Sequence, residues 1–129
     1  MNLIQGEISG SESPRFRASE GQFELGLERT AARALSGGAR RKVVLGIRPE
    51  DLAVAAPGRS KNAAGALPAR VELVELLGGE ALVHLDSGGV DLTARVPAPF
   101  SVNGTDLTVT VPLERIHLFD GETGQRLDE

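Results

Sequence analysis

Apolar and polar side chains alternate along most of this chain with the period of a β-strand. The clearest alternating segments are 23–27 (FELGL), 66–77 (ALPARVELVELL), 80–87 (EALVHLDS), 90–98 (VDLTARVPA) and 107–111 (LTVTV). Successive side chains of a strand point to opposite faces, so each segment predicts a strand with one buried face. Leu3, Ile4 and Ile8 indicate a further strand near the start, and residues 116–119 (IHLF) another near the end.

Two glycine pairs separate the three longest of these segments. Gly78-Gly79 lies between the first and second, and Gly88-Gly89 lies between the second and third. Glycine reaches the positive φ angles that tight hairpin turns require. The sequence therefore predicts two consecutive β-hairpins. Residues 10–14 (GSESP) and 120–124 (DGETG) predict further turns, and Pro112 predicts a short turn over 113–115.

The alternation also assigns faces within the hairpins. The residues predicted to point inward are Val71, Leu73, and Leu82 with its period-2 neighbours. The residues predicted to stay in solvent are Arg70, Glu72, His84 and Asp91.

Two regions lack a strand pattern. Residues 29–42 start with good helix formers, but Gly37-Gly38 interrupts them, which predicts a loop with one helical turn. Residues 56–66 are rich in small residues without periodicity, which predicts an exposed loop. With many short strands and no long helix, the chain predicts an all-β barrel or sandwich. Its 129 residues fit a single domain, 1–129, with one core.

Composition narrows the function. The formal net charge of -4 and the aromatic content of 3% argue against a nucleic-acid partner, because they provide neither a positive field nor stacking surfaces. The chain has no cysteine, so it has neither a disulfide framework nor a thiolate metal site, and an intracellular setting fits. It begins without a secretory-type segment and contains no apolar stretch long enough to cross a membrane.

Motifs for catalysis are missing from these residues. No GxxxxGK[ST] phosphate loop and no GxSxG nucleophile elbow occurs, and the two histidines, His84 and His117, stand far apart in strand patterns. Glu75 and Glu80 flank the first glycine pair, where a carboxylate pair could serve acid-base chemistry. Two solvated charges at a hairpin end are the preferred interpretation, and that position suits contact with a partner. We therefore predict no enzyme activity, no metal and no cofactor for these residues.

Residues 46–52 (GIRPEDL) form a corner between two apolar stretches. Pro49 cannot donate to a strand ladder and pushes Arg48 toward extended geometry, so it should end the strand and set the direction of departure. Arg48 and Glu50 could then satisfy backbone groups at the corner or face a partner, and the structural role is preferred.

The run Arg40-Arg41-Lys42 precedes an apolar strand segment. A solvated edge that blocks aggregation is the preferred interpretation. The alternative is a site for a small oxyanion or a sugar phosphate, which would make the chain a ligand sensor.

Three motifs occur together and in order: GIRPEDL (46–52), VELVELLGGEALVHL (71–85) and PLERIHLFDGETGQRL (112–127). This set resembles the C-terminal TOBE domain of the ATP-binding subunits of bacterial sugar and glycerol-phosphate ABC importers. The resemblance implies an OB-fold-like β-barrel with additional strands, of the TOBE or MOP-like kind.

The resemblance also implies a non-catalytic regulatory and dimerisation role in a subunit that couples ATP hydrolysis to solute import. The implied partners are a second copy, a nucleotide-binding domain, a permease and a regulatory protein, at the cytoplasmic side of the inner membrane. The residues expected to carry contacts are Gly46, Arg48 and Glu50 at the corner, and Glu75, Gly78 and Glu80 on the hairpin.

Overall fold

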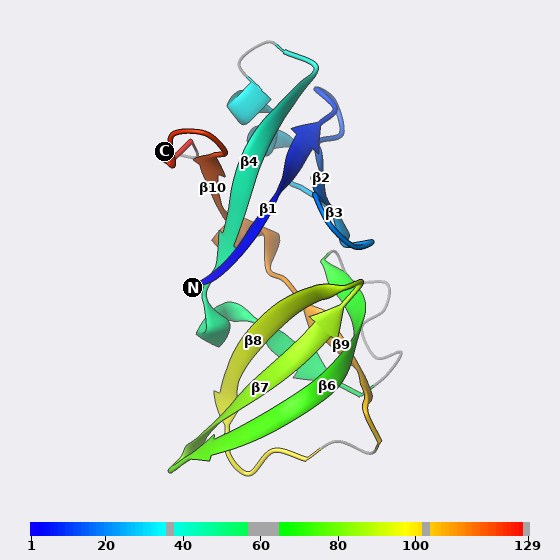
Figure 1. The fold of residues 1–129 in the computed structure, drawn as a ribbon, viewed down its shortest axis with the longest axis vertical. Coiled ribbons are helices and arrows are strands. Elements are labelled where there is room, and N and C mark those ends of the chain that lie inside the picture. Colours follow the sequence, from blue (N-terminus) through cyan, green and yellow to red (C-terminus); the bar gives the residue numbers. More distant parts are fainter. Residues whose placement is uncertain (36–37, 57–64, 102–103, 128–129) are drawn as a thin grey trace.

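The computed structural model describes residues 1–35, 38–56, 65–101 and 104–127, which form two antiparallel five-stranded sheets placed one beyond the other (Figure 1). The first sheet has the order β10-β4-β1-β2-β3, and the second has the order β5-β9-β6-β7-β8. The strands of the first sheet are β1 (Asn2–Ser9), β2 (Arg15–Ala18), β3 (Glu24–Gly26), β4 (Arg40–Ile47) and β10 (His117–Asp120). The strands of the second are β5 (Ala53–Ala55), β6 (Ala66–Leu77), β7 (Glu80–Ser87), β8 (Val90–Pro97) and β9 (Asp106–Thr110). The all-β prediction, an OB-fold-like barrel with additional strands, is confirmed.

The first sheet is built around β4. β1 pairs with β4 over its whole length, from Asn2 opposite Ile47 to Ser9 opposite Arg40, and β10 pairs with the other side of β4. Ile4 and Ile8 of β1 are buried, as the alternation predicts. The basic run lies at the start of β4, where Arg40, Arg41 and Lys42 pair with β1, whereas β10 on the other side of β4 reaches only Val43. Its predicted role as a solvated edge that blocks aggregation stays a prediction.

The second sheet confirms the two predicted hairpins. β6 and β7 turn at Gly78-Gly79, and β7 and β8 turn at Gly88-Gly89, with φ of 63° at Gly78, 60° at Gly88 and 88° at Gly89. β7 buries Ala81, Val83 and Leu85 and leaves Leu82 half-buried, so the faces assigned to Leu82 and its period-2 neighbours are wrong.

A β-bulge explains the other misassigned face. The register of β6 on β7 shifts between Val71 and Leu73, which leaves Glu72 without an opposite residue. One extra residue exchanges the two faces of a strand beyond it. Leu73, predicted to point inward, is consequently 55% exposed.

The chain crosses between the sheets twice. After β4, the 3-10 turn η2 (Pro49–Asp51) leads into β5, and after β9 the 3-10 turn η3 (Leu113–Arg115) leads back to β10. Side chains from both sheets join one buried cluster, which includes Ile47, Leu52, Leu92 and Val111. A backbone hydrogen bond from Gln22 to the Gly88 carbonyl also links the β2–β3 turn to the second sheet.

The remaining predictions have mixed outcomes. Residues 29–42 hold a 3-10 helix, η1 (Arg29–Leu35), before β4 begins. The strand predicted over 23–27 is shorter, and β2 and β5 were not predicted. Most of the loop predicted at 56–66 lies outside the described residues. None of the helices in the described ranges has the length and apolar character needed to cross a membrane.

Candidate functional site

The corner residues predicted to make contacts differ in exposure. Gly46 is buried in β4, whereas Arg48 and Glu50 are exposed on either side of Pro49. A side chain at Gly46 would place its Cβ 2.7 Å from Met1 Sδ, which real structures essentially never show, and 3.1 Å from Phe119 Cε2, which is unusually tight. Gly46 therefore allows close packing beneath the surface.

Pro49 ends β4 as predicted. Arg48 has φ of -74° and ψ of 144°, which is extended geometry, and Pro49 opens η2. The backbone makes the turn by itself, because Asp51 N–H donates to the Arg48 carbonyl and Leu52 N–H to the Pro49 carbonyl. The Arg48 side chain caps nothing, and neither it nor that of Glu50 forms a hydrogen bond or ion pair with any described residue. The prediction that these side chains satisfy backbone groups at the corner is wrong.

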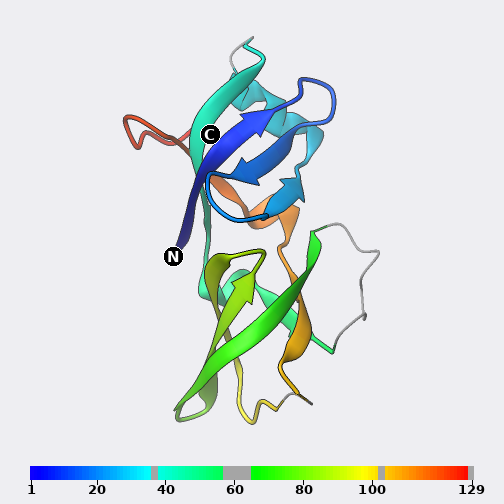
Figure 2. The same cartoon turned by 45° about the vertical axis from the view of Figure 1, so that its right-hand side comes forward.

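The hairpin residues lie at the far end of the second sheet (Figures 1 and 2). Glu75, Gly78 and Glu80 are all exposed there. Gly78 has φ of 63° and no atom near the position of a Cβ, so the turn requires glycine for its backbone and not for space.

The two glutamates do not form a carboxylate pair for acid-base chemistry. Glu75 Oε1 lies 2.6 Å from His84 Nε2, and Glu80 Oε2 lies 3.6 Å from Arg95 Nε. Each carboxylate thus has a partner of its own and stays about half exposed, with side-chain exposures of 50% and 55%. Surface pairs of this kind contribute at most about 1 kcal/mol each.

Sequence reasoning missed the exposed leucines of this hairpin. Leu73, Leu76 and Leu77 are 55%, 69% and 53% exposed, whereas elsewhere in the described residues only Met1 and Leu3 are large apolar side chains with comparable exposure. The adjacent pair Leu76-Leu77 could have predicted an exposed leucine, because two consecutive strand residues point to opposite faces and cannot both face one core.

A chain of hydrogen bonds connects the hairpin to the corner. His84, bonded to Glu75, has its Nδ1 3.3 Å from Thr93 Oγ1 on β8. The side chain of Asn2 accepts from Thr93 N–H at 2.8 Å and donates to the Thr93 carbonyl at 2.9 Å. The same Asn2 amide lies 3.2 Å from the carbonyl of Ile47, the residue before Arg48. The Asn2 clasp, meaning these three bonds of the Asn2 side chain, thus joins β8 to the first sheet.

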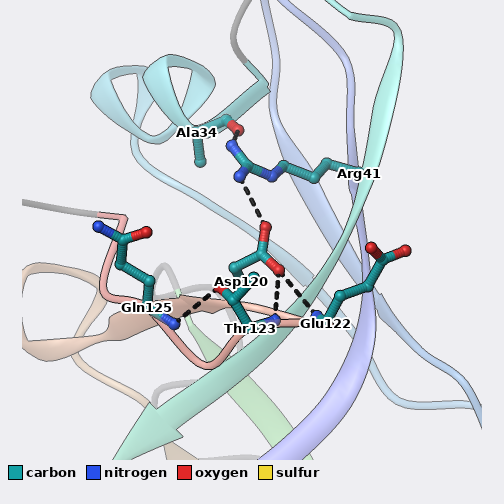
Figure 3. Close-up of polar contacts among 6 residues, drawn as sticks. All are labelled: Ala34, Arg41, Asp120, Glu122, Thr123 and Gln125. Atoms are coloured by element: carbon teal, nitrogen blue, oxygen red, sulfur yellow. Dashed lines mark hydrogen bonds and ion pairs between the residues drawn. The ribbon is translucent and has the colours of Figure 1, made fainter.

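Arg41, the middle residue of the basic run, is bonded on two sides (Figure 3). Arg41 donates to the Ala34 carbonyl at 2.8 Å and to Asp120 Oδ2 at 2.7 Å. Hydrogen bonds from the backbone N–H of Thr123, from Arg41 and from the N–H of Glu122 hold the pKa of Asp120 well below its usual range. Arg41 therefore ties η1 and the turn after β10 to β4.

The surroundings of this run are of mixed charge. Arg40 lies 3.8 Å from Glu7, and the surface hollow beside the run is lined by Glu7, Asp120 and Glu122 as well as by its three basic residues. Equal numbers of acidic and basic side chains leave little net attraction for an anion. In the part of the chain that the structure describes, no group of three or more histidine, aspartate or glutamate residues is placed to hold a metal ion.

The geometry therefore defines a β-barrel whose distinctive surface is an exposed hairpin. Two family models match the chain: the TOBE domain over residues 45–119 and the MalK OB fold domain over residues 1–52. The chain belongs to the TOBE domain family.

The matching relatives are subunits of importers. The chain is 39% identical over 134 residues to the sn-glycerol-3-phosphate import ATP-binding protein UgpC of Salmonella typhi, and 35% identical over 132 residues to that of Escherichia coli O157:H7. Each match covers 98% of the chain but only 33% of the relative, so the chain spans about a third of these proteins. These matches confirm the resemblance to glycerol-phosphate importer subunits.

A solved structure has the same fold. The cytoplasmic molybdate-binding protein ModG, crystallised with molybdate bound, superposes with a TM-score of 0.69 at 18% identity. The superposition covers 91% of this chain and 94% of ModG. At this identity the likeness concerns the fold.

Proposed function

We propose that residues 1–129 act as a single non-catalytic regulatory and dimerisation domain of the ATP-binding subunit of a bacterial ABC importer. The observation that carries the regulatory contact role is the exposed hairpin, where Glu75, Gly78 and Glu80 stand among solvent-exposed leucines. Exposed apolar side chains that are clustered on one element mark sites of protein contact. The similarity to ATP-binding subunits of glycerol-phosphate importers supplies the biological setting.

Several contacts support action as one unit. The buried cluster draws on both sheets, and the Asn2 clasp and the Gln22 to Gly88 bond fasten them at two separate places. In the whole subunit, ATP hydrolysis and import would belong to a nucleotide-binding domain and a permease at the cytoplasmic side of the inner membrane. This domain would hold two subunits together at high effective concentration and receive a regulatory protein.

Sedimentation velocity over a concentration series tests the self-association. We expect a monomer–dimer equilibrium whose midpoint lies in an accessible concentration range. Arg48→Ala should weaken this dimer without lowering the melting temperature, because the Arg48 side chain bonds to no described residue. A strictly monomeric chain at the highest soluble concentration would count against the dimerisation role.

The ligand-sensor alternative has less support. The basic run faces Glu7, Asp120 and Glu122, and Arg41 is already bonded on two sides. We expect no rise in melting temperature with molybdate, tungstate, sulfate or sugar phosphates, whereas a ligand at 100 times its Kd would add about 2.7 kcal/mol of stability.

A further inference from the structure

The outermost strands of the two sheets are poorly suited to pairing with another strand. The outward N–H and C=O of Thr93, in the middle of edge strand β8, are both bonded by Asn2. At β10, Arg126 bridges to Phe119 and Leu127 N–H donates to the Leu118 carbonyl. The other two edge strands, β3 and β5, have three residues each. Covered and very short edges disfavour strand addition. β9 pairs with β6 only over Ala66–Arg70, so the far half of β6 keeps one side open next to its exposed leucines.

One sheet face carries two of the three exposed leucines of this hairpin, Leu73 and Leu77, whereas Leu76 lies opposite Ala81 on the other face. Residues that lie opposite one another in an antiparallel pair share a face. Leu73 lies opposite His84, Glu75 opposite Leu82, and Leu77 opposite Glu80. We call this surface the outer hairpin face and define it by these six residues together with Thr93 and Arg95, which lie opposite His84 and Leu82 on β8. The other side of β7 is buried in the core through Ala81, Val83 and Leu85.

The outer hairpin face has an acidic excess. The face carries two carboxylates, Glu75 and Glu80, and one arginine, Arg95, whose Nε lies 3.6 Å from Glu80 Oε2. His84, which contacts Glu75, adds a positive charge only when it is protonated. Glu72, displaced at the bulge beside this face, is exposed and forms no ion pair with any described residue. Favourable contact with this face therefore calls for positive charge.

We propose that the outer hairpin face docks a protein segment that presents two apolar side chains on either side of a basic one. Leu73, Glu75 and Leu77 alternate along β6, and alternate residues of a strand are spaced by roughly 7 Å. An extended partner segment has the same period, so its apolar residues can cover the leucines while its lysine or arginine meets Glu75. This inference rests on the proposed contact role of the domain and specifies the partner.

Charge argues against two other occupants. A second copy would bring the same glutamates together across a symmetric contact, and like charges so placed repel. An anionic membrane surface would repel them as well. The proposed self-association would then use a different surface of the barrel.

Nuclear magnetic resonance titration of the whole ¹⁵N-labelled chain tests the proposal. The probe is a short peptide in which leucine, lysine and leucine alternate with threonine, and the matched probe has glutamate in place of lysine. We expect saturable shifts of backbone amides confined to β6–β8, with a Kd about tenfold lower for the lysine probe. Leu77→Ser should raise that Kd about tenfold, because it removes one of the two apolar contacts of the face. Glu75→Lys should reverse the preference between the probes.

Leu3→Ser is the matched control, because Leu3 is an equally exposed leucine on β1 of the other sheet, at 63% exposure. It should leave both affinities unchanged. Absent or scattered shifts, equal binding of the two probes, or an equal loss in Leu3→Ser would overturn the proposal. Sedimentation of the same variants distinguishes the proposed basic partner from the proposed dimer. If Leu77→Ser abolishes dimerisation, the outer hairpin face binds a second copy, and the proposal of a basic partner is wrong. A monomeric wild type that still binds the lysine probe would overturn only the dimer.

Discussion

The corner and the hairpin were predicted to serve the same purpose, yet they are built in opposite ways. An added Cβ at Gly46 would lie 2.7 Å from Met1 Sδ and 3.1 Å from Phe119 Cε2, whereas Gly78 sits in open solvent and needs only its backbone freedom. Both glycines lie in motifs of the same family, but one is required for close packing and the other for its backbone conformation. The corner is a packed joint between sheets, and the hairpin is the exposed surface.

The largest difference in stability should appear when a side chain is added at the corner or at the hairpin turn. Gly46→Val should lower the free energy of unfolding by about 1–3 kcal/mol, because its branched side chain must displace Met1 and the Phe119 ring. Gly79→Ala is the control, since no atom lies within 4 Å of where its Cβ would stand and the φ of Gly79 is not in the left-handed region. Urea unfolding measures both. Equal losses would mean that the corner is no more tightly packed than the hairpin turn.

The Asn2 clasp should be the next most sensitive element. Asn2→Ala removes three hydrogen bonds and leaves the Thr93 amide without its partner. We expect a loss of about 1–3 kcal/mol in urea unfolding, together with faster hydrogen exchange at Thr93. Asn2→Asp keeps the acceptor for Thr93 N–H and should lose less. If Thr93 exchange is the same in Asn2→Ala and the wild type, the clasp does not protect the edge of β8.

The Arg41–Asp120 contact should give a pH-dependent difference. The pKa of Asp120 is lowered in the folded chain, so the stability it contributes is complete above the ordinary carboxyl range and is lost as pH falls from about 4 toward the folded pKa. The stability gap between wild type and Asp120→Asn should therefore be larger at pH 7 than at pH 3 in urea unfolding. Glu122→Gln serves as the control, because only the backbone of Glu122 takes part in this contact. A gap that widens toward acid would contradict the assignment.

The smallest stability effect is expected on the outer hairpin face. Leu77→Ser should change the free energy of unfolding by no more than about 0.5 kcal/mol, because Leu77 is already 53% exposed. Thermal and urea unfolding measure this directly. A loss comparable with that of Gly46→Val would show that Leu77 supports the fold, and the contrast between the two regions would fail.

Local patterns predicted what depends on local geometry. Strict alternation and two glycine pairs predicted β6, β7, β8 and both turns, and Pro49 predicted the end of β4. The bulge at Glu72 has no comparable signal in the sequence, and it alone exposes Leu73. Contacts between distant residues were also beyond reach: Asn2 and Thr93 are 91 positions apart, and Arg41 and Asp120 are 79 apart. The sequence does not single out Thr93 as the partner of Asn2, or Asp120 as the partner of Arg41.

The order of strands along the chain has a consequence for synthesis. All strands of the second sheet fall between Ala53 and Thr110, whereas the first sheet combines β1–β4 with β10, which begins at His117. A domain emerging from the ribosome exposes its N-terminal part first. The side of β4 that pairs with β10 therefore stays unpaired until nearly all of β10 has been synthesised. That unpaired strand edge is where a nascent chain of this architecture is most vulnerable to aggregation.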